Sequence, residues 1–522
     1  MKPQLLLSMK GYKKKDLLGD LMAGLMVAII ALPLSIALGI QSVPAEVSTR
    51  GIQFGIITAI VAGFFISAIG GSKHQIGGPT AAFVTILFGY LANPDIGVLG
   101  LAIAGIMAGV ILILMGLFKA GNVMKFFPFP ITVGFTTGIG VTLLIGQIKD
   151  FCGFSASGTE AIEKIISYVE NISSFDLATF GVGALGLLCV ILLPKLSKKI
   201  PAAFVALIVC TGATFLLNGI FNANVATIGS KYGDVQAGFF PVDFSGIGNI
   251  KFGALIMPSI VIAFLCAIES LLSATVAANM TGTTFDANQE LVGQGVANIG
   301  SSLLGGLPAT GAIARTAASI ENGAKSPLAG IFHALFLLVM YFALMGVLQY
   351  IPLAVFSAIL ISVAINMSRF PLFVKLAGFG IRDAIILWAT FTLTVVFDLT
   401  YGVLGGVAIT FLLNIKNIKI GMNVSLDEKD ENMNGMPDCA TLNVKGTLFF
   451  LNANKLADKA IETLQNVDKL IIDFSCLERV DETALQKIKS IENSAIKLNK
   501  SVEFVGLNVD VAARFEKYYK VV

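Results

Sequence analysis

Charged residues are scarce in this chain of 522 residues. Lys, Arg, Asp and Glu together make up 13% of the sequence, whereas soluble globular chains carry roughly 25%. Hydrophobic residues account for 55%, and the formal net charge is only +3. No strongly basic field is available to bind nucleic acid. The composition indicates a polytopic α-helical membrane protein whose surroundings are the lipid bilayer.

Residues suited to metal binding or disulfide formation are also few. The two histidines, His74 and His333, are far apart in the sequence, and the six cysteines show no CxxC spacing. This pattern predicts neither a zinc site nor a disulfide framework. We therefore expect no metal and no cofactor, and an ordinary packed or loop position for each histidine.

Long apolar runs, by contrast, are abundant and form two sets of seven. About 20 apolar residues span a hydrocarbon core of about 30 Å, and the first run is expected to be a retained span rather than a signal peptide. The runs after Pro79 and Pro308 are too short to cross a bilayer as regular helices, and each is third in its set. The 14 expected segments are 20–40, 51–70, 79–92, 97–118, 128–148, 175–194, 200–219, 253–278, 288–306, 309–321, 326–348, 351–366, 382–398 and 402–418.

Lysine and arginine are distributed unevenly between alternate loops. Lys10, Lys13, Lys14 and Lys15 precede the first segment. The loops expected on the same side carry Lys73, Lys119, Lys125, Lys195, Lys198, Lys199, Arg369, Lys375 and Arg382. Loops on the cytoplasmic side are enriched in these residues. We therefore predict a multi-pass protein of the plasma (inner) membrane with both termini in the cytoplasm.

The composition changes near residue 423. The stretch SLDEKDENMNGMPD is polar and acidic, which is typical of a linker. Beyond it, strand-like runs such as KLIIDFS and VEFVGLN, both expected to be buried, alternate with helix-like stretches. We predict a membrane domain over residues 1–422, a linker over 423–438 and a small cytoplasmic α/β domain over 439–522.

Two short segments are the first candidates for a binding site. IGGPTAAFVTIL (76–87) and GLPATGAIARTA (306–317) each place Gly and Pro before a short run rich in Ala and Thr. Such pairs, in matching positions of two halves, mark the substrate site of transporters with inverted repeats. A helix that begins at mid-membrane presents unpaired N–H groups and the positive end of its dipole, which suits an anion. The alternative is a pair of kinked or re-entrant helices without a ligand.

Arg315 and Glu269 are isolated charges within these apolar surroundings. A charge at membrane depth is costly unless it lines a cavity or has a partner. The guanidinium of Arg315 suits the planar oxygens of carboxylate, carbonate or sulfate, or it forms a structural ion pair with Glu269 or Glu321. Glu269, with Ser273 on the same helix face, is a candidate for loading and releasing a proton, with an ion pair to Arg315 as the alternative.

Several stretches together resemble the sulfate-permease (SulP) anion transporter family, which includes prestin and pendrin. They are ALPLSIALG (31–39), GGPTAAF (77–83), AIESLLSATVA (267–277) and the long segment 288–330, while KLIIDFSCLERVDETAL (469–485) resembles a STAS domain. The resemblance implies 14 segments in two inverted repeats of seven, with uracil-permease-like core and gate or scaffold domains. It also implies alternating access between those domains and a homodimer.

The same resemblance implies which residues form the site. By motif position, those that bind substrate are Ser35, Gly78, Pro79, Thr80, Ala81, Phe83, Gly311, Ala312, Ile313 and Arg315, and those that couple an ion are Glu269 and Ser273. Sodium-coupled bicarbonate members have Thr at the position of Ile313, so a sodium site is disfavoured here. Thr483 stands where related bacterial regulators have a phosphorylated serine, and we expect it to pack at a helix N-terminus instead.

These observations predict a transporter rather than an enzyme. We expect secondary active transport of a small inorganic or carboxylate anion (bicarbonate, sulfate or a dicarboxylate) by proton symport. The alternatives are uncoupled anion exchange, channel-like flux, or sodium-coupled bicarbonate symport. A nucleobase permease would carry an acidic residue where this chain has Arg315, and a regulator acting only through its STAS domain would leave the paired short segments unexplained.

Overall fold

The computed structural model describes residues 1–522 except 122–127, 155–157, 159, 198–199, 379, 398, 421, 429–438 and 522. The chain divides into two compact units, which are considered separately. The first comprises Met1–Met124 and Ile139–Met367, and the second comprises Lys125–Gly138 and Ser368–Val522.

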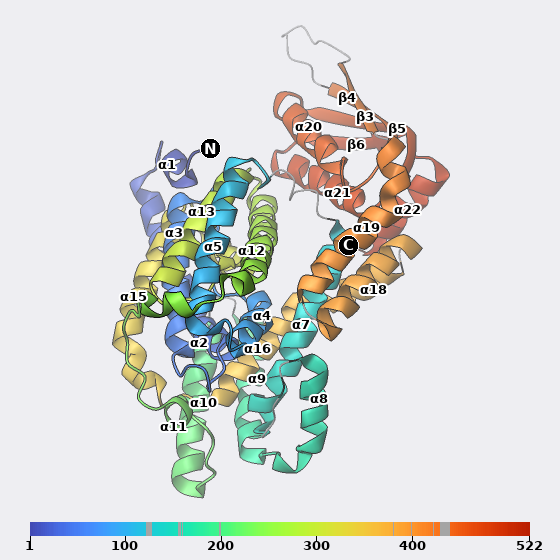
Figure 1. The fold of residues 1–522 in the computed structure, drawn as a ribbon. Coiled ribbons are helices and arrows are strands. Elements are labelled where there is room, and N and C mark those ends of the chain that lie inside the picture. The colour runs from blue at the N-terminus through green and yellow to red at the C-terminus, as the bar shows by residue number, and fades with distance from the viewer. Residues whose placement is uncertain are drawn as a thin grey trace. The chain divides into compact units, whose positions relative to one another are not determined.

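Each of the 14 predicted membrane segments coincides with a helix (Figure 1). Within the part of the chain that the structure describes, nine helices are long and apolar enough to cross a membrane; the total of 14 spans stays a prediction. The helices are α2 (Lys14–Ser42), α3 (Gly51–Ile69), α4 (Ala81–Ala92), α5 (Gly97–Leu117), α7 (Phe129–Cys152), α9 (Leu177–Leu196), α10 (Ala202–Phe221), α12 (Phe252–Thr281), α13 (Ala287–Leu303), α14 (Ile313–Glu321), α15 (Leu328–Leu348), α16 (Leu353–Ser368), α18 (Ile381–Val396) and α19 (Leu399–Ile420). Shorter helices are α1 (Gln4–Ser8), α8 (Ala161–Glu170), α11 (Ile228–Tyr232) and α17 (Phe370–Ala377).

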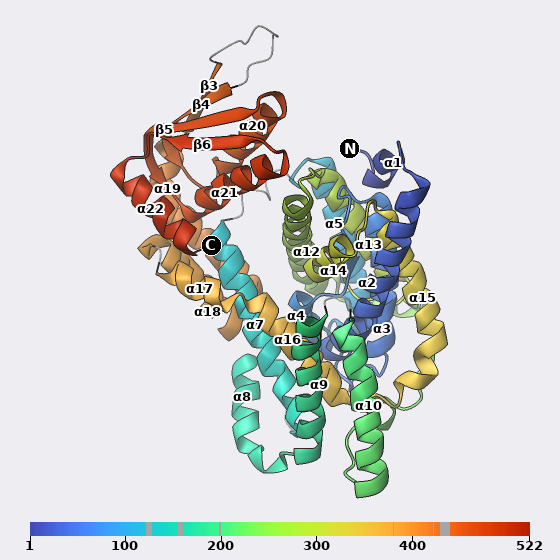
Figure 2. The ribbon, with the colours of Figure 1, turned by 180° about the vertical axis from the view of Figure 1, so that it is seen from behind.

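In the first unit, α13 packs against α5 and α3, while α15 packs against α2 and α3 (Figures 1 and 2). Small residues allow such helices to approach closely, which drives association where apolar side chains gain nothing by leaving lipid. At the crossing of α5 and α13, a Cβ atom added to Gly109 would lie 2.6 Å from the carbonyl oxygen of Gly295. A Cβ atom added to Gly295 would lie 2.5 Å from that of Gly109. This pair of glycines therefore determines how closely the two helices approach.

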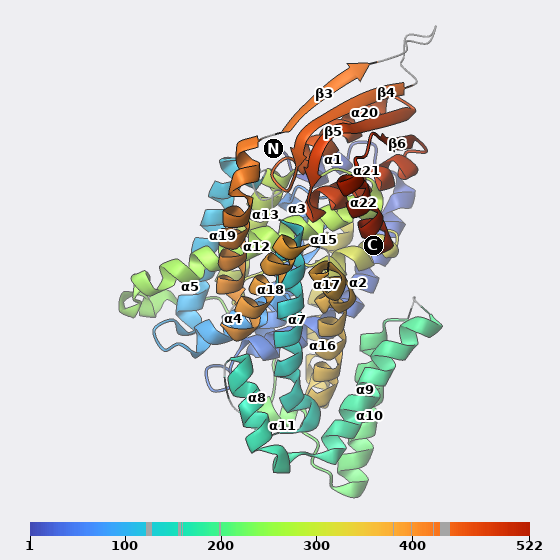
Figure 3. The same cartoon turned by 90° about the vertical axis from the view of Figure 1, so that its right-hand side faces the viewer.

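The second unit contains a four-stranded sheet in the order β3-β4-β5-β6 (Figure 3). β3 (Met422–Glu428) is antiparallel to β4 (Cys439–Leu448), whereas β5 (Lys469–Val480) is parallel to both β4 and β6 (Ser501–Val505). The helices α20 (Ala453–Asn466), α21 (Glu482–Lys497) and α22 (Val509–Val521) complete this α/β domain. Its core holds buried residues of β4, β5 and all three helices, as the apolar patterning predicts.

Two expectations for this region need correction. The predicted linker begins within β3, because residues 423–428 pair with β4 in the sheet; the remainder, 429–438, lies outside the described residues. Neither expected buried run is fully buried. Along the KLIIDFS part of β5, buried side chains alternate with half-buried or exposed ones, and β6, an edge strand, has only exposed and half-buried side chains. An apolar run alone cannot distinguish a central strand from an edge strand that is covered on one face.

Thr483 lies in the first turn of α21 and is 3% exposed. Its Oγ1 accepts a hydrogen bond of 2.9 Å from the backbone N–H of Phe129, at the start of α7. The hydroxyl therefore satisfies an N–H group that a helix N-terminus leaves unpaired. This agrees with the expectation that Thr483 packs at a helix N-terminus.

Candidate functional site

The two short predicted segments lie side by side in the first unit. β1 (Gly77–Gly78) and β2 (Thr310–Gly311) pair in antiparallel fashion, with Gly77 opposite Gly311. α4 and α14 begin only a few residues after these strands, and neither helix has a side-chain cap at its N-terminus. Two helix N-termini that lack side-chain caps, each with the positive end of its dipole, therefore begin next to the strand pair.

Arg315 is buried in the first turn of α14, with 1% of its surface exposed. Its Nη1 donates to the carbonyl oxygen of Gly77 at 3.0 Å, and its Nη2 donates to Ser35 Oγ at 3.1 Å and to the carbonyl oxygen of Pro79 at 3.5 Å. Among the described residues its Nε has no partner, and no carboxylate, including those of Glu269 and Glu321, forms an ion pair with it. The structure therefore does not contain the structural ion pair that we considered as an alternative.

Gly78 leaves the space that the guanidinium occupies. A Cβ atom added there would lie 1.5 Å from Nη1 of Arg315, a distance that no pair of unbonded atoms tolerates. Gly78 in the first short segment is thus required for the observed position of Arg315 in the second, although more than 230 residues separate them.

Glu269 lies on α12 and is half-buried. Its Oε2 accepts a hydrogen bond of 2.8 Å from Thr80 Oγ1, at the residue that precedes α4. Ser273, four residues further along α12, is fully buried and donates to Thr316 Oγ1 at 3.3 Å. Thr316 also accepts from the backbone N–H of Ile76, so Ser273 contacts the frame of the site rather than Glu269.

The other predicted site residues lie around the two helix starts. Ala81, Phe83, Gly311 and Ala312 are buried, and Ile313 is partly exposed. Phe83 is 1% exposed, so its ring has almost no surface left for a ligand in this conformation. Ala314, which we did not predict, is exposed and lies between Ile313 and Arg315 at the start of α14.

Buried polar residues that the sequence analysis missed hold the irregular backbone. Asn298 bonds both to the N–H and to the carbonyl oxygen of Ala309, each at 2.9 Å. Ser270 Oγ lies 2.7 Å from Thr310 Oγ1 and accepts from the N–H of Gly311 at 3.1 Å. Glu290 accepts from the N–H groups of residues 71 and 72. These contacts satisfy buried backbone groups, as irregular chain inside a membrane requires.

A sequence signal for part of this frame was available. Glu290, Gln294 and Asn298 recur at intervals of four residues along α13, and residues with this spacing share one face of a helix. Gln294 Nε2 donates to Glu290 Oε1 at 2.8 Å. A polar stripe on an otherwise apolar helix therefore indicates the face that supports the site.

Comparison with known proteins agrees with this arrangement. Residues 17–390 match the family model described as the sulfate permease family, and residues 432–519 match the STAS domain. A putative sulfate transporter of Bacillus subtilis (strain 168), YvdB, is 37% identical, with 95% of this chain and 93% of the relative covered. The bicarbonate transporter BicA of a Picosynechococcus strain is 27% identical, with 96% and 91% covered.

Solved structures show the same fold. The transmembrane domain of a cyanobacterial bicarbonate transporter, BicA, matches with a TM-score of 0.67 at 27% identity, covering 76% of this chain and 98% of that one. The structure of SLC26A9 matches with a TM-score of 0.69 at 18% identity, covering 98% and 88%. The membrane helices, the STAS domain and the family match together identify this chain as an anion transporter, not an enzyme, that belongs to the sulfate permease family.

Proposed function

We propose that the chain is a secondary active transporter of a small oxyanion, with Arg315 and the N-termini of α4 and α14 as its binding site. The observation that carries the proposal is a fully buried guanidinium with no carboxylate partner among the described residues. Burying an unpaired charge is costly, and a bound anion offsets that cost. The N–H groups and dipoles of the two helices add to the same preference for negative charge.

Sulfate and bicarbonate are the first substrates to test, because the names of the relatives refer to them, and C4-dicarboxylates are the next. All three present oxygens in a plane or at a tetrahedral corner that match a guanidinium fork. The helix N–H groups and one arginine accept each of them, so the proposal is a class of anion and not one compound.

We propose proton symport, with Glu269 as the group that carries the proton. The hydrogen bond from Thr80 joins this carboxylate to the start of α4, so its protonation state and the position of the half-helix are mechanically linked. Sodium coupling is a weaker alternative, because Ile313 provides no oxygen ligand and a sodium site requires several of them. Uncoupled exchange is the remaining alternative, and it predicts uptake that is indifferent to the pH gradient.

The test is uptake of radiolabelled sulfate, bicarbonate and a C4-dicarboxylate into proteoliposomes, with and without an inward proton gradient. We expect one or more of these anions to accumulate, with stimulation by the gradient. Arg315→Ala abolishes that accumulation if the proposal is right. Full uptake of every transported anion by Arg315→Ala contradicts it, and uptake that requires sodium but not the gradient would replace proton symport with sodium symport.

The orientation and assembly are part of the same proposal. We propose that both termini lie in the cytoplasm, because the lysine-rich loops share the side of the N-terminus, and that the protein forms a homodimer in the plasma membrane. Protease protection of the STAS domain in oriented vesicles tests the first statement, and the mass of the protein in detergent tests the second.

A further inference from the structure

A cavity of about 460 Å³ lies in the first unit where α2, α4, α7, α8 and α11 meet. Three lysines line it: Lys149 at the end of α7, Lys164 on α8 and Lys231 on α11. A neighbouring cavity of about 870 Å³ shares Lys149, Asp150 and Lys231 with it. None of these residues belongs to the site around Arg315.

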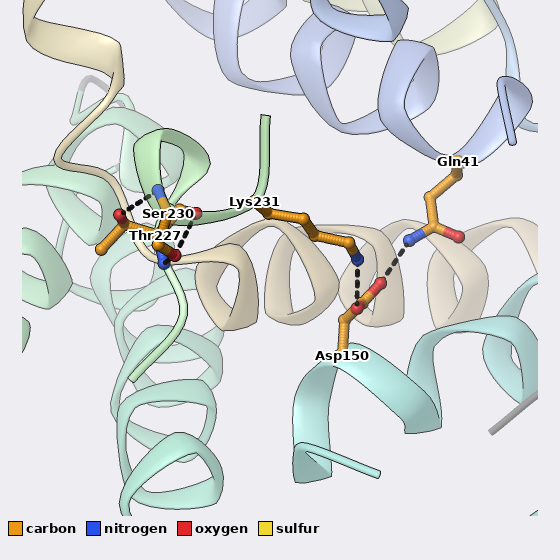
Figure 4. A network of polar contacts seen from close by, with 5 residues as sticks. All are labelled: Gln41, Asp150, Thr227, Ser230 and Lys231. Carbon is orange, nitrogen blue, oxygen red and sulfur yellow. Dashed lines mark hydrogen bonds and ion pairs between the residues drawn. The ribbon is translucent and has the colours of Figure 1, made fainter. Parts of the chain in front are cut away.

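One of the three lysines has its charge balanced. Lys231 Nζ lies 3.4 Å from Asp150 Oδ1, and Asp150 Oδ2 accepts from Gln41 Nε2 at 3.0 Å (Figure 4). Thr227 and Ser230 bond to each other in a capping box that fixes the short helix carrying Lys231. Asp150 thus connects α7 to α2 and α11, and each of its carboxylate oxygens has one of these partners.

Lys164 and Lys149 are different, because neither forms an ion pair in the part of the chain that the structure describes. Lys164 is half-buried, and its Nζ lies 5.6 Å from the centre of the Phe88 ring. Burial, with repulsion from Lys149, lowers the pKa of Lys164 below its ordinary value. Two carboxylates lie nearby, those of Glu46 and Glu163, but both side chains are exposed, and solvent screens their effect.

The cavity also reaches the half-helix that starts at the proposed central site. Val84, Thr85 and Phe88 of α4 line it. Phe88 follows Thr80 by eight residues, which corresponds to about 12 Å along a helix. An anion that occupies the cavity therefore lies one short helix away from Arg315.

We propose that Lys164 and Lys149 form a second anion-binding station, which holds a small oxyanion on its way to or from the central site. Two neighbouring cations without ion-pair partners repel one another, and a single anion between them removes that repulsion and gains two charge contacts. The carboxylate of Asp150, which also lines the cavity, is already held by Lys231 and Gln41. The inference rests on the proposed function only in naming a transported oxyanion as the occupant.

The direct test is chemical protection of the two lysines in the full-length protein. The purified protein is treated with an amine-acylating reagent at increasing sulfate or bicarbonate, and the labelling rate of each lysine is read by peptide mass spectrometry. Acylation of Lys164 and Lys149 falls with saturation, by about three-fold when the anion is at about twice its dissociation constant. Exposed Lys195, at the end of α9, is the internal reference and keeps its rate.

Variants separate this station from the central site. In Arg315→Ala the protection of Lys164 persists, because the station binds its own anion; loss of protection in that variant would overturn the inference. Lys164→Gln shifts the protection of Lys149 to higher anion concentration. It also raises the anion concentration that half-saturates uptake from the cavity's side of the membrane. Each shift is about five-fold, the size of one partly exposed charge contact. Lys164→Arg keeps both properties, and Lys195→Gln changes neither.

The two proposals fail in distinguishable ways. If the protein takes up anions but Lys164 shows no saturable protection, the second anion-binding station is contradicted and the proposed function is not. If Lys164 shows saturable protection but the protein transports none of the tested anions, the proposed function is contradicted and the second station is not. If Lys164→Gln raises the half-saturating anion concentration of uptake equally from both sides of the membrane, a station on one side is also contradicted.

Discussion

The starts of α4 and α14 offer the clearest comparison within the first unit. Both helices are the third segment of their set, and each follows a two-residue strand that pairs with the other. Phe83 and Arg315 are each the third residue of their helix, and each is 1% exposed. The same backbone arrangement therefore carries an apolar ring in one half and a cation in the other.

The contacts of the charged groups follow the same division. Arg315 and Glu269 both lie in the second half of the membrane domain. Their partners Ser35, Gly77, Pro79 and Thr80 all lie in the first half. One half supplies the charges, and the other supplies neutral oxygens that hold them in place. The site therefore depends on both halves, although the isolated charges lie in only one of them.

After the loss of Arg315 itself, the largest effect is expected from Gly78→Ala, which changes the neutral half alone. The new methyl group occupies the position of the guanidinium, so Arg315 must leave its pocket. We expect uptake to fall roughly 10- to 100-fold, the size of a lost hydrogen bond to a charged group. Gly89→Ala on α4, the helix that follows Gly78, is the matched control, because no atom of the described residues lies within 4 Å of a Cβ atom there. Normal uptake by Gly78→Ala would show that Arg315 can act from elsewhere.

Glu269→Gln tests the other charge and ranks second. The amide still accepts a hydrogen bond from Thr80 but cannot load and release a proton. We expect the variant to lose the stimulation of uptake by a proton gradient, with a fall of about ten-fold at the most favourable gradient. Thr80→Val, which removes the hydrogen bond that links Glu269 to the start of α4, reduces the stimulation but does not abolish it. Gradient-stimulated uptake by Glu269→Gln would assign the proton to another group.

Phe83→Leu tests whether the apolar residue at the start of α4 contributes to anion selection. Because this ring is buried and contributes no charge, a conservative replacement alters packing and leaves the anion contacts intact. We expect half-saturation to change by less than about three-fold, with the same order of preference among the anions. A change of preference larger than that of Arg315→Lys would show that the ring, and not the charge, selects the substrate.

The smallest effect on uptake is expected from Glu482→Gln in the second unit. Glu482 is fully buried, and both its carboxylate oxygens lack a partner among the described residues. Burial, and then the nearby carboxylate of Asp383, raises its pKa well above the ordinary value of 4.5. The folded state therefore favours the protonated form, and the associated stability is present below about pH 4.5 and declines as the pH rises toward the folded pKa.

We expect Glu482→Gln to remove this loss of stability at high pH while uptake remains normal. In detergent, thermal unfolding of the wild-type protein shifts to lower temperature between about pH 5 and about pH 8, and the variant shows a smaller shift and is the more stable at pH 8. Glu478→Gln is the control, because that side chain on β5 is exposed. An identical pH dependence in wild type and Glu482→Gln would contradict the prediction.

Much of the membrane fold followed from the sequence, because span length and hydropathy are local properties. All 14 segments coincide with helices, and the glycines and prolines near Gly78 and Pro308 correctly indicated the two helix breaks. Local pattern also indicated Arg315 as unusual. The edge position of β6 and the pairing of β3 were not predictable, since both depend on which strands lie next to one another.

The partners of the charged residues could not be derived from the sequence either. Arg315 bonds to atoms 236 to 280 residues away, and nothing in its neighbourhood distinguishes a carbonyl partner from the carboxylate of Glu269. The polar residues of α13 could be predicted only in part. The four-residue spacing of Glu290, Gln294 and Asn298 indicates that they share one helix face, but it does not indicate which backbone groups they bond.

The central claim is that Arg315 and the two half-helices form one anion site. Its most direct test is equilibrium binding of the anion found to be transported, measured by calorimetry on the purified full-length wild-type protein, Arg315→Lys and Arg315→Ala. We expect Arg315→Lys to bind the anion more weakly than wild type. We expect Arg315→Ala to lose binding at the central site while the protection of Lys164 remains. If wild type and Arg315→Ala bind the anion with the same affinity and the same heat of binding, Arg315 is not part of the anion site.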